Sequence, residues 1–164
     1  MRKIVLYAAV ALIGALSLSA CQKQSDQTAP QAQQVARPTS PTDAAGWKNY
    51  LVQVVTKNMQ GMTANQPYMY YVPAGADDAS VQARQRQLEN VSGTVARGVL
   101  PGNLMAFGGP DSSQTAQMII TAFKDASPGS FKGVIVLFVG DQADEQGVAQ
   151  ALQGSAATFR FVQM

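Results

Sequence analysis

The chain has 164 residues, of which 46% are hydrophobic and 13% are charged, with 12 Lys and Arg against 10 Asp and Glu. It contains no His and one Cys, which excludes a Ser-His-Asp triad, a Cys-His nucleophile, a His-ligated zinc site and an internal disulfide. The length suffices for one domain with its own hydrophobic core.

The first residues follow the order of an export signal. Arg2 and Lys3 supply positive charge, and residues 4–18 form an apolar run that is shorter than a membrane span. A Leu-Ser-Ala-Cys sequence closes this segment and ends at Cys21, the single cysteine of the chain. The segment resembles the signal peptide of bacterial lipoproteins, in which a Leu and small residues lead directly to the modified Cys.

The resemblance implies that residues 1–20 are removed and that Cys21 carries a lipid, so the membrane is one expected partner. Gln22 stands where such proteins often carry the Asp that retains them in the inner membrane. The resemblance therefore favours the outer membrane, with the domain facing the periplasm. Loss of Arg2 and Lys3 with the signal leaves equal numbers of basic and acidic residues, so we expect no nucleic-acid partner.

Residues 21–42 separate the signal from the rest of the chain. They are dominated by Gln, Ser, Thr, Ala and Pro, a composition that cannot bury enough apolar surface to order itself. We therefore expect the lipidated Cys and a flexible linker over residues 21–42, followed by a domain over residues 43–164.

The first part of the domain predicts a helix and then a strand. The helix begins with Thr42 or Asp43 as its N-cap, and Gly61 is placed to stop it as the C′ residue. Its apolar residues recur at helical spacing on one side: Trp47, Tyr50, Leu51, Val54, Val55 and Met59. Residues 68–72 are aromatic and β-branched and lie between two prolines, as is typical of a strand.

The next two helices differ in their apolar content. A helix from Asp77 or Asp78 to about Ser92 has only a thin apolar face, so we expect it to be largely solvated. A short strand over residues 104–107 follows. Asp111 then has the position of an N-cap for a third helix with a clear apolar stripe.

Residues 134–139 give the strongest strand signal. They are apolar at consecutive positions, which indicates a strand that is covered on both faces and lies near the centre of the sheet. A helix from Asp141 to Gly154 and an alternating strand over residues 158–162 follow, with this last strand toward an edge. Strands separated by helices predict a single α/β domain with a mainly parallel, four-stranded sheet.

Several polar residues follow the predicted strands, at the edge where parallel sheets commonly bind ligands. Asp77, Asp111, Ser112 and Asp141 supply carboxylate and hydroxyl oxygens that suit a hard cation or a small ligand. The same residue types are also preferred helix N-caps. Because the spacing matches no known metal-binding motif, we expect no metal and no other cofactor.

The loop over residues 108–113 supports two further interpretations. Its glycines and the following helix start can cradle an anion, or they can form an ordinary turn. Neither a phosphate-binding motif nor a Lys is present in the loop, and no base is identifiable for Ser112 as a nucleophile.

Candidates for a protein interface lie on the first strand and on the second helix. Tyr70 belongs to a run of tyrosines around Met69, and such residues are enriched at protein interfaces. Arg84 and Arg86 lie in the Gln-rich helix and can form a polar docking surface. The competing interpretations are packing of the tyrosine in the core and a simple solvated helix face.

The absence of common catalytic groups leads us to expect a non-enzymatic binding or assembly module with a protein partner in the envelope. It would belong to an envelope or secretion complex, or neutralise a toxin as an immunity lipoprotein. The alternative is a metal-dependent hydrolase or small-ligand-binding domain that uses the carboxylates at the carboxyl edge of the sheet.

Overall fold

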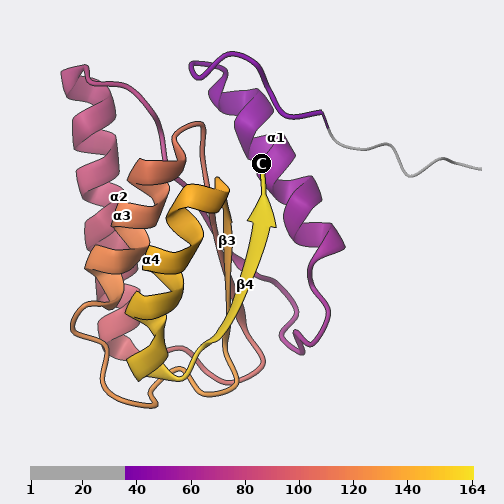
Figure 1. Cartoon of the computed structure of the whole chain (residues 1–164), viewed down its shortest axis with the longest axis vertical. Coiled ribbons are helices and arrows are strands. Elements are labelled where there is room, and N and C mark those ends of the chain that lie inside the picture. Colours follow the sequence, from indigo (N-terminus) through magenta and orange to yellow (C-terminus); the bar gives the residue numbers. More distant parts are fainter. Residues whose placement is uncertain (1–35) are drawn as a thin grey trace, which may run out of the picture. The chain divides into compact units, whose positions relative to one another are not determined.

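The structure is a computed structural model that describes residues 36–164 (Figure 1). The predicted signal peptide, Cys21 and residues 22–35 of the predicted linker lie outside the described residues. Across residues 36–164, none of the helices combines the length and the apolar character that crossing a membrane requires.

Helices and strands alternate along the described chain. In order they are α1 (Ala44–Lys57), β1 (Tyr68–Tyr71), α2 (Asp78–Arg97), β2 (Leu104–Gly108), α3 (Ser112–Phe123), β3 (Ile135–Gly140), α4 (Gln142–Leu152), the 3₁₀ turn η1 (Gln153–Ser155) and β4 (Thr158–Gln163). All neighbouring strands pair in parallel, in the order β1-β2-β3-β4. The predicted α/β domain with a parallel four-stranded sheet is confirmed.

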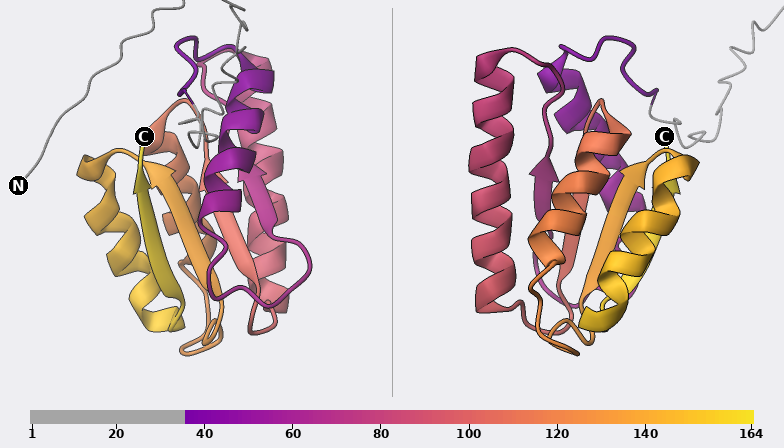
Figure 2. Two further views of the ribbon diagram at one scale, coloured as in Figure 1. Left: turned by 90° about the vertical axis from the view of Figure 1, so that its right-hand side faces the viewer. Right: turned by 60° about the vertical axis from the view of Figure 1, so that its left-hand side comes forward.

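The sheet lies between two helical layers. Figure 2 shows α1 alone on one face and α2, α3 and α4 together on the other. Residues of opposite parity on each strand point to opposite faces, so Tyr70 joins the core under α2, α3 and α4 whereas Tyr71 packs on the α1 side. Strand β1 is thus one edge of the sheet, and β4 is the other.

The central strand explains the run of consecutive apolar residues. Every residue of β3 is buried, because the α1 layer covers one face and the three-helix layer covers the other. The predicted position of this strand inside the sheet, with β4 at an edge, is confirmed. Burial on both faces is what permits an apolar sequence without alternation.

Aspartates begin the helices as predicted. The carboxylates of Asp43, Asp77 and Asp111 each accept a hydrogen bond from the amide three positions later, at 2.8, 2.9 and 3.1 Å. Asp141 occupies the N-cap position of α4 but its side chain makes no such bond. Three of these aspartates therefore satisfy helix amides that would otherwise lack a partner.

Two predicted helix ends are wrong. Helix α1 ends at Lys57 instead of Gly61, since Asn58 caps it through its side-chain donation to the Val54 carbonyl at 2.8 Å. Helix α2 continues to Arg97 instead of Ser92. Its additional turn buries Thr94 and Val95, and this packing outweighs the low helix propensity of Gly93.

The segment before α1 contacts the domain. The indole nitrogen of Trp47 donates to the Ser40 carbonyl at 2.9 Å, and the guanidinium of Arg37 lies 5.5 Å from the centroid of the Trp47 ring. Arg37 also approaches the Asp141 carboxylate to 4.0 Å. The last residues of the predicted linker therefore pack against the domain before residue 43.

Candidate functional site

The carboxyl edge of the sheet holds a polar depression of about 350 Å³. It brings together three of the four predicted ligand-binding residues, and it is lined by Pro41, Ala74, Pro110, Asp111, Ser112, Ser113, Asp141 and Asp144. Asp77 does not line it. Instead, hydrogen bonds from the side chain and the backbone of Ser80 lower the pKa of Asp77 at the start of α2.

Ser112 is the centre of the hydrogen bonding in this depression. Its hydroxyl donates to the Asp144 carboxylate at 2.5 Å and accepts from the Asp141 amide at 2.7 Å. The Ser112 side chain is buried at 5% exposure. These bonds join the start of α3 to the start of α4, so the hydroxyl serves the packing of two helices.

Asp111 lies in the same depression and caps α3. The Asp111 carboxylate accepts from the Gln114 amide at 3.1 Å and from the Ser113 hydroxyl at 2.8 Å. Within residues 36–164, no group of three or more His, Cys, Asp or Glu side chains is placed to hold a metal ion. The contacts describe helix caps and links between helices, in agreement with the capping interpretation.

The glycines of the loop after β2 have a packing role. A Cβ atom on Gly109 would lie 2.0 Å from the Val72 carbonyl oxygen, and one on Gly108 would lie 2.8 Å from the Leu51 side chain. A side chain at Gly109 would therefore force apart the loops that follow β1 and β2, and one at Gly108 would displace Leu51 of α1. Glycine is required here for close approach of the chain, whether or not an anion binds.

Tyr70, predicted as an interface residue, is a core residue instead. It is 5% exposed, and its ring stacks on Phe107 with a centroid distance of 4.9 Å and an interplanar angle of 20°. Burial raises the pKa of its phenol, an effect that a hydrogen bond with Thr94 opposes. The parity of the parallel strand directs this side chain inward, so Tyr70 is not accessible to a partner.

The two predicted interface arginines of α2 differ from each other. Arg84 donates to the carbonyl oxygens of Pro73 and Gly75 at 3.0 and 2.8 Å and thereby holds the loop between β1 and α2. Arg86 is exposed on the same helix. Arg84 therefore stabilises this loop. Of the three predicted interface residues, Tyr70, Arg84 and Arg86, only Arg86 is exposed.

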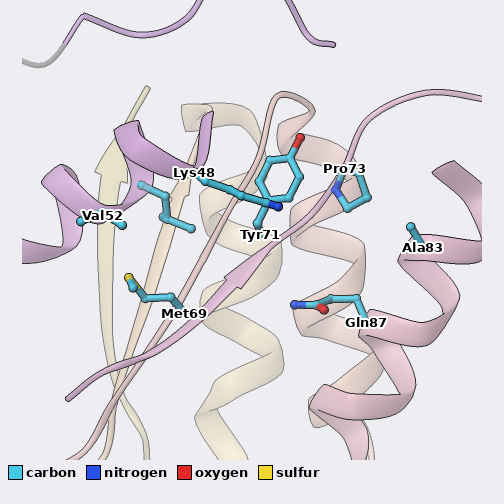
Figure 3. Close-up of a pocket in the computed structure, with 8 residues that line it drawn as sticks. Lys48, Val52, Met69, Tyr71, Pro73, Ala83 and Gln87 are labelled. Carbon is cyan, nitrogen blue, oxygen red and sulfur yellow. The ribbon is translucent and has the colours of Figure 1, made fainter. Parts of the chain in front are cut away.

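A second and larger depression follows the open edge of the sheet. This edge groove has a volume of about 520 Å³ and runs beside β1 between α1 and α2 (Figure 3). Its lining residues come from both helices, from β1 and from the loop after it: Lys48, Leu51, Val52, Met69, Tyr71, Pro73, Ala83 and Gln87. Five of these eight residues have apolar side chains, so the groove is mainly apolar.

Large apolar side chains are exposed at the edge groove and beside it. Val52 on α1 is 44% exposed, and Tyr68 and Met69 on β1 are each 43% exposed. The Lys48 ammonium lies 5.4 Å from the centroid of the Tyr71 ring, where it is attracted to the aromatic face. Burial raises the pKa of the Tyr71 phenol, and the nearby charge of Asp43 adds to this effect.

Sequence reasoning missed the edge groove because it depends on strand order. The run of tyrosines around Met69 indicated an interface on this strand, but it did not show that Tyr70 is buried while Tyr68 and Met69 are exposed.

Comparisons with protein-family models, with curated proteins and with solved structures found no match for this chain. The function is therefore inferred from the geometry of the domain itself.

Proposed function

We propose that this protein is a lipid-anchored lipoprotein of the bacterial envelope whose domain binds another protein through the edge groove and catalyses no reaction. One observation carries the proposal: a mainly apolar groove with exposed Val52 and Met69 lies beside a sheet edge that pairs with no further strand of the described chain. Exposed apolar surface of this kind marks sites of association.

The composition of the groove supports a protein ligand. Methionine and aromatic side chains are enriched at protein interfaces, and charged residues are depleted at their centres. The edge groove has Met69 and Tyr71 on its strand, and Lys48 is its single charged lining residue. A small polar metabolite would find few hydrogen-bonding side chains there.

The lipoprotein-like signal supports attachment to the membrane through Cys21. Cleavage before Cys21 and its acylation would give a stable anchor, because more than one acyl chain suffices for lasting membrane attachment. In this proposal the domain faces the periplasm from the outer membrane. Its partner is a component of an envelope or secretion complex, or a toxin that the lipoprotein neutralises.

Site-specific photocrosslinking in cells tests the proposal. A benzophenone amino acid replaces Val52 or Met69 in the groove, and the control carries it at Gln146, which is exposed on α4 in the opposite helical layer. We expect a discrete crosslinked protein from both groove positions and none from the control. The proposal is wrong if the groove positions give no such species, or if Gln146 gives it equally.

A further inference from the structure

The backbone of β1 has hydrogen-bonding groups that face away from the sheet. The Val72 amide donates to the Gly108 carbonyl at 2.9 Å, which fixes the phase of the pairing between β1 and β2. Successive residues of a parallel strand direct their backbone groups to opposite sides, so those of Met69 and Tyr71 point outward. No other residue of the described chain hydrogen bonds to these groups.

The two edges of the sheet are protected to different degrees. On β4, Arg160 donates to the carbonyls of Asn58 and Gln60, which ties this strand to the segment after α1. None of the large apolar residues exposed in the described chain lies on β4, whereas Tyr68 and Met69 of β1 are exposed. Proteins normally cover such an edge or place charge or proline on it. None of the four residues of β1 is charged or a proline.

We propose that an extended segment of the partner protein adds to β1 as a fifth strand and carries a carboxylate that pairs with Lys48. This inference rests on the proposed function, because it specifies how a protein would occupy the edge groove. The outward backbone groups of Met69 and Tyr71 supply the hydrogen bonds of strand addition, and the walls formed by α1 and α2 receive alternate side chains. The segment spans about 13 Å, the length of a four-residue strand.

Charge determines the chemistry of the added strand. Lys48 is the single charged residue that lines the groove, and no carboxylate lines it. An Asp or Glu on the side of the added strand that faces α1 would therefore meet an ammonium without an acidic partner in the groove. The remaining positions on that side face Val52, Leu51 and Met69, which favour apolar side chains.

A second copy of this chain is not the favoured occupant of the groove. Its strand over residues 68–71 has the sequence Tyr-Met-Tyr-Tyr and brings no carboxylate. Pairing of two β1 edges would therefore bring no strand carboxylate to either Lys48. The groove is complementary to a different, acidic and extended polypeptide.

Hydrogen exchange tests strand addition directly. The mature lipidated protein in phospholipid nanodiscs is used to select peptides from a random decapeptide library, and each selected peptide is then added at saturation. We expect amide exchange at Met69 and Tyr71 to slow by at least about tenfold, while Tyr70 and Val72 are protected in both states. Selection of no peptide, or of peptides that leave the Met69 and Tyr71 amides unprotected, overturns strand addition.

Charge reversal tests the carboxylate. Lys48→Glu should weaken the selected peptides by at least about tenfold, and replacing the peptide's acidic residue by Lys should restore binding to this variant. Lys132→Glu, at an exposed position outside the groove, is the control and should leave affinity unchanged. Equal affinity of Lys48→Glu and the parent chain overturns the proposed pairing. Crosslinks from Val52 that persist while Met69 and Tyr71 stay unprotected would retain the proposed function and reject the added strand.

Discussion

The polar depression and the edge groove differ in whether their polar groups already have partners. At the carboxyl edge, the Ser112 hydroxyl, the Asp144 carboxylate and the Asp141 amide satisfy one another. Along the edge groove, the outward backbone groups of Met69 and Tyr71 have no partner in the described chain, and large apolar side chains are exposed. A cluster of carboxylates and hydroxyls can thus serve only to stabilise the fold. A surface with few such groups can instead present the unpaired backbone groups and exposed apolar side chains on which binding depends.

The largest expected effect comes from placing the same charge in the centre and at the edge of the sheet. Val136→Asp buries an unpaired carboxylate in β3, where the native side chain is 0% exposed, and should lower the free energy of unfolding by at least about 4 kcal/mol. Met69→Asp, at a 43% exposed position, should cost less than about 1 kcal/mol. Urea denaturation measures both, and equal losses would contradict the assignment of β1 as an open edge.

The polar depression should respond to loss of its central hydroxyl. Ser112→Ala removes both of its hydrogen bonds and should lower the free energy of unfolding by about 1 to 3 kcal/mol. Ser113→Ala, at an exposed position, is the matched control and should change stability by less than about 0.5 kcal/mol. Neither variant should alter crosslinking from Val52. A loss of crosslinking without a loss of stability would shift the binding site to the polar depression.

The helix caps give a smaller and graded effect. Asp111→Ala should cost about 1 kcal/mol of unfolding free energy, because the carboxylate caps α3. Asp141→Ala should cost only a few tenths of a kcal/mol, since this side chain makes no cap hydrogen bond. Thermal unfolding of the two variants checks the difference. A greater loss for Asp141→Ala would indicate a role in the depression beyond capping.

The smallest effect concerns alkaline pH. Burial raises the pKa of Tyr70 in the folded state above its ordinary value, so the phenol ionises more readily after unfolding. This contribution to stability is complete below pH of about 10 and is lost as pH rises through the folded-state pKa. Chemical denaturation between pH 8 and about 11 should show the decline, and Tyr70→Phe should reduce its slope. An unchanged slope would mean that other groups cause it.

Local signals predicted much of the fold. Asp43, Asp77 and Asp111 were recognisable as N-caps because a cap depends on only a few neighbouring residues. The end of α2 was not recognisable, because Val95, beyond the predicted end at Ser92, is held in the helix by packing against residues distant in sequence. The spacing of apolar residues within one segment does not reveal contacts with other elements of the fold.

The candidate sites show the same division. Parallel topology predicted correctly that Asp111, Ser112 and Asp141 meet at one edge. It did not predict the Ser112 bond to Asp144, which links residues 32 positions apart and depends on side-chain placement. The edge groove also escaped prediction, because strand order decides whether β1 is an edge and the sequence pattern does not encode that order.

The central claim is that the open edge of β1 is the binding surface, and a proline at Met69 tests it most directly. Met69→Pro removes one outward amide and should leave the sheet paired, since proline is tolerated where the strand amide faces away from the ladder. Met69→Ala is the control because it shortens the side chain and keeps the amide. We predict that crosslinking from Val52 is lost in Met69→Pro and retained in Met69→Ala, with both variants folded by circular dichroism. Full crosslinking in the folded proline variant would contradict the account.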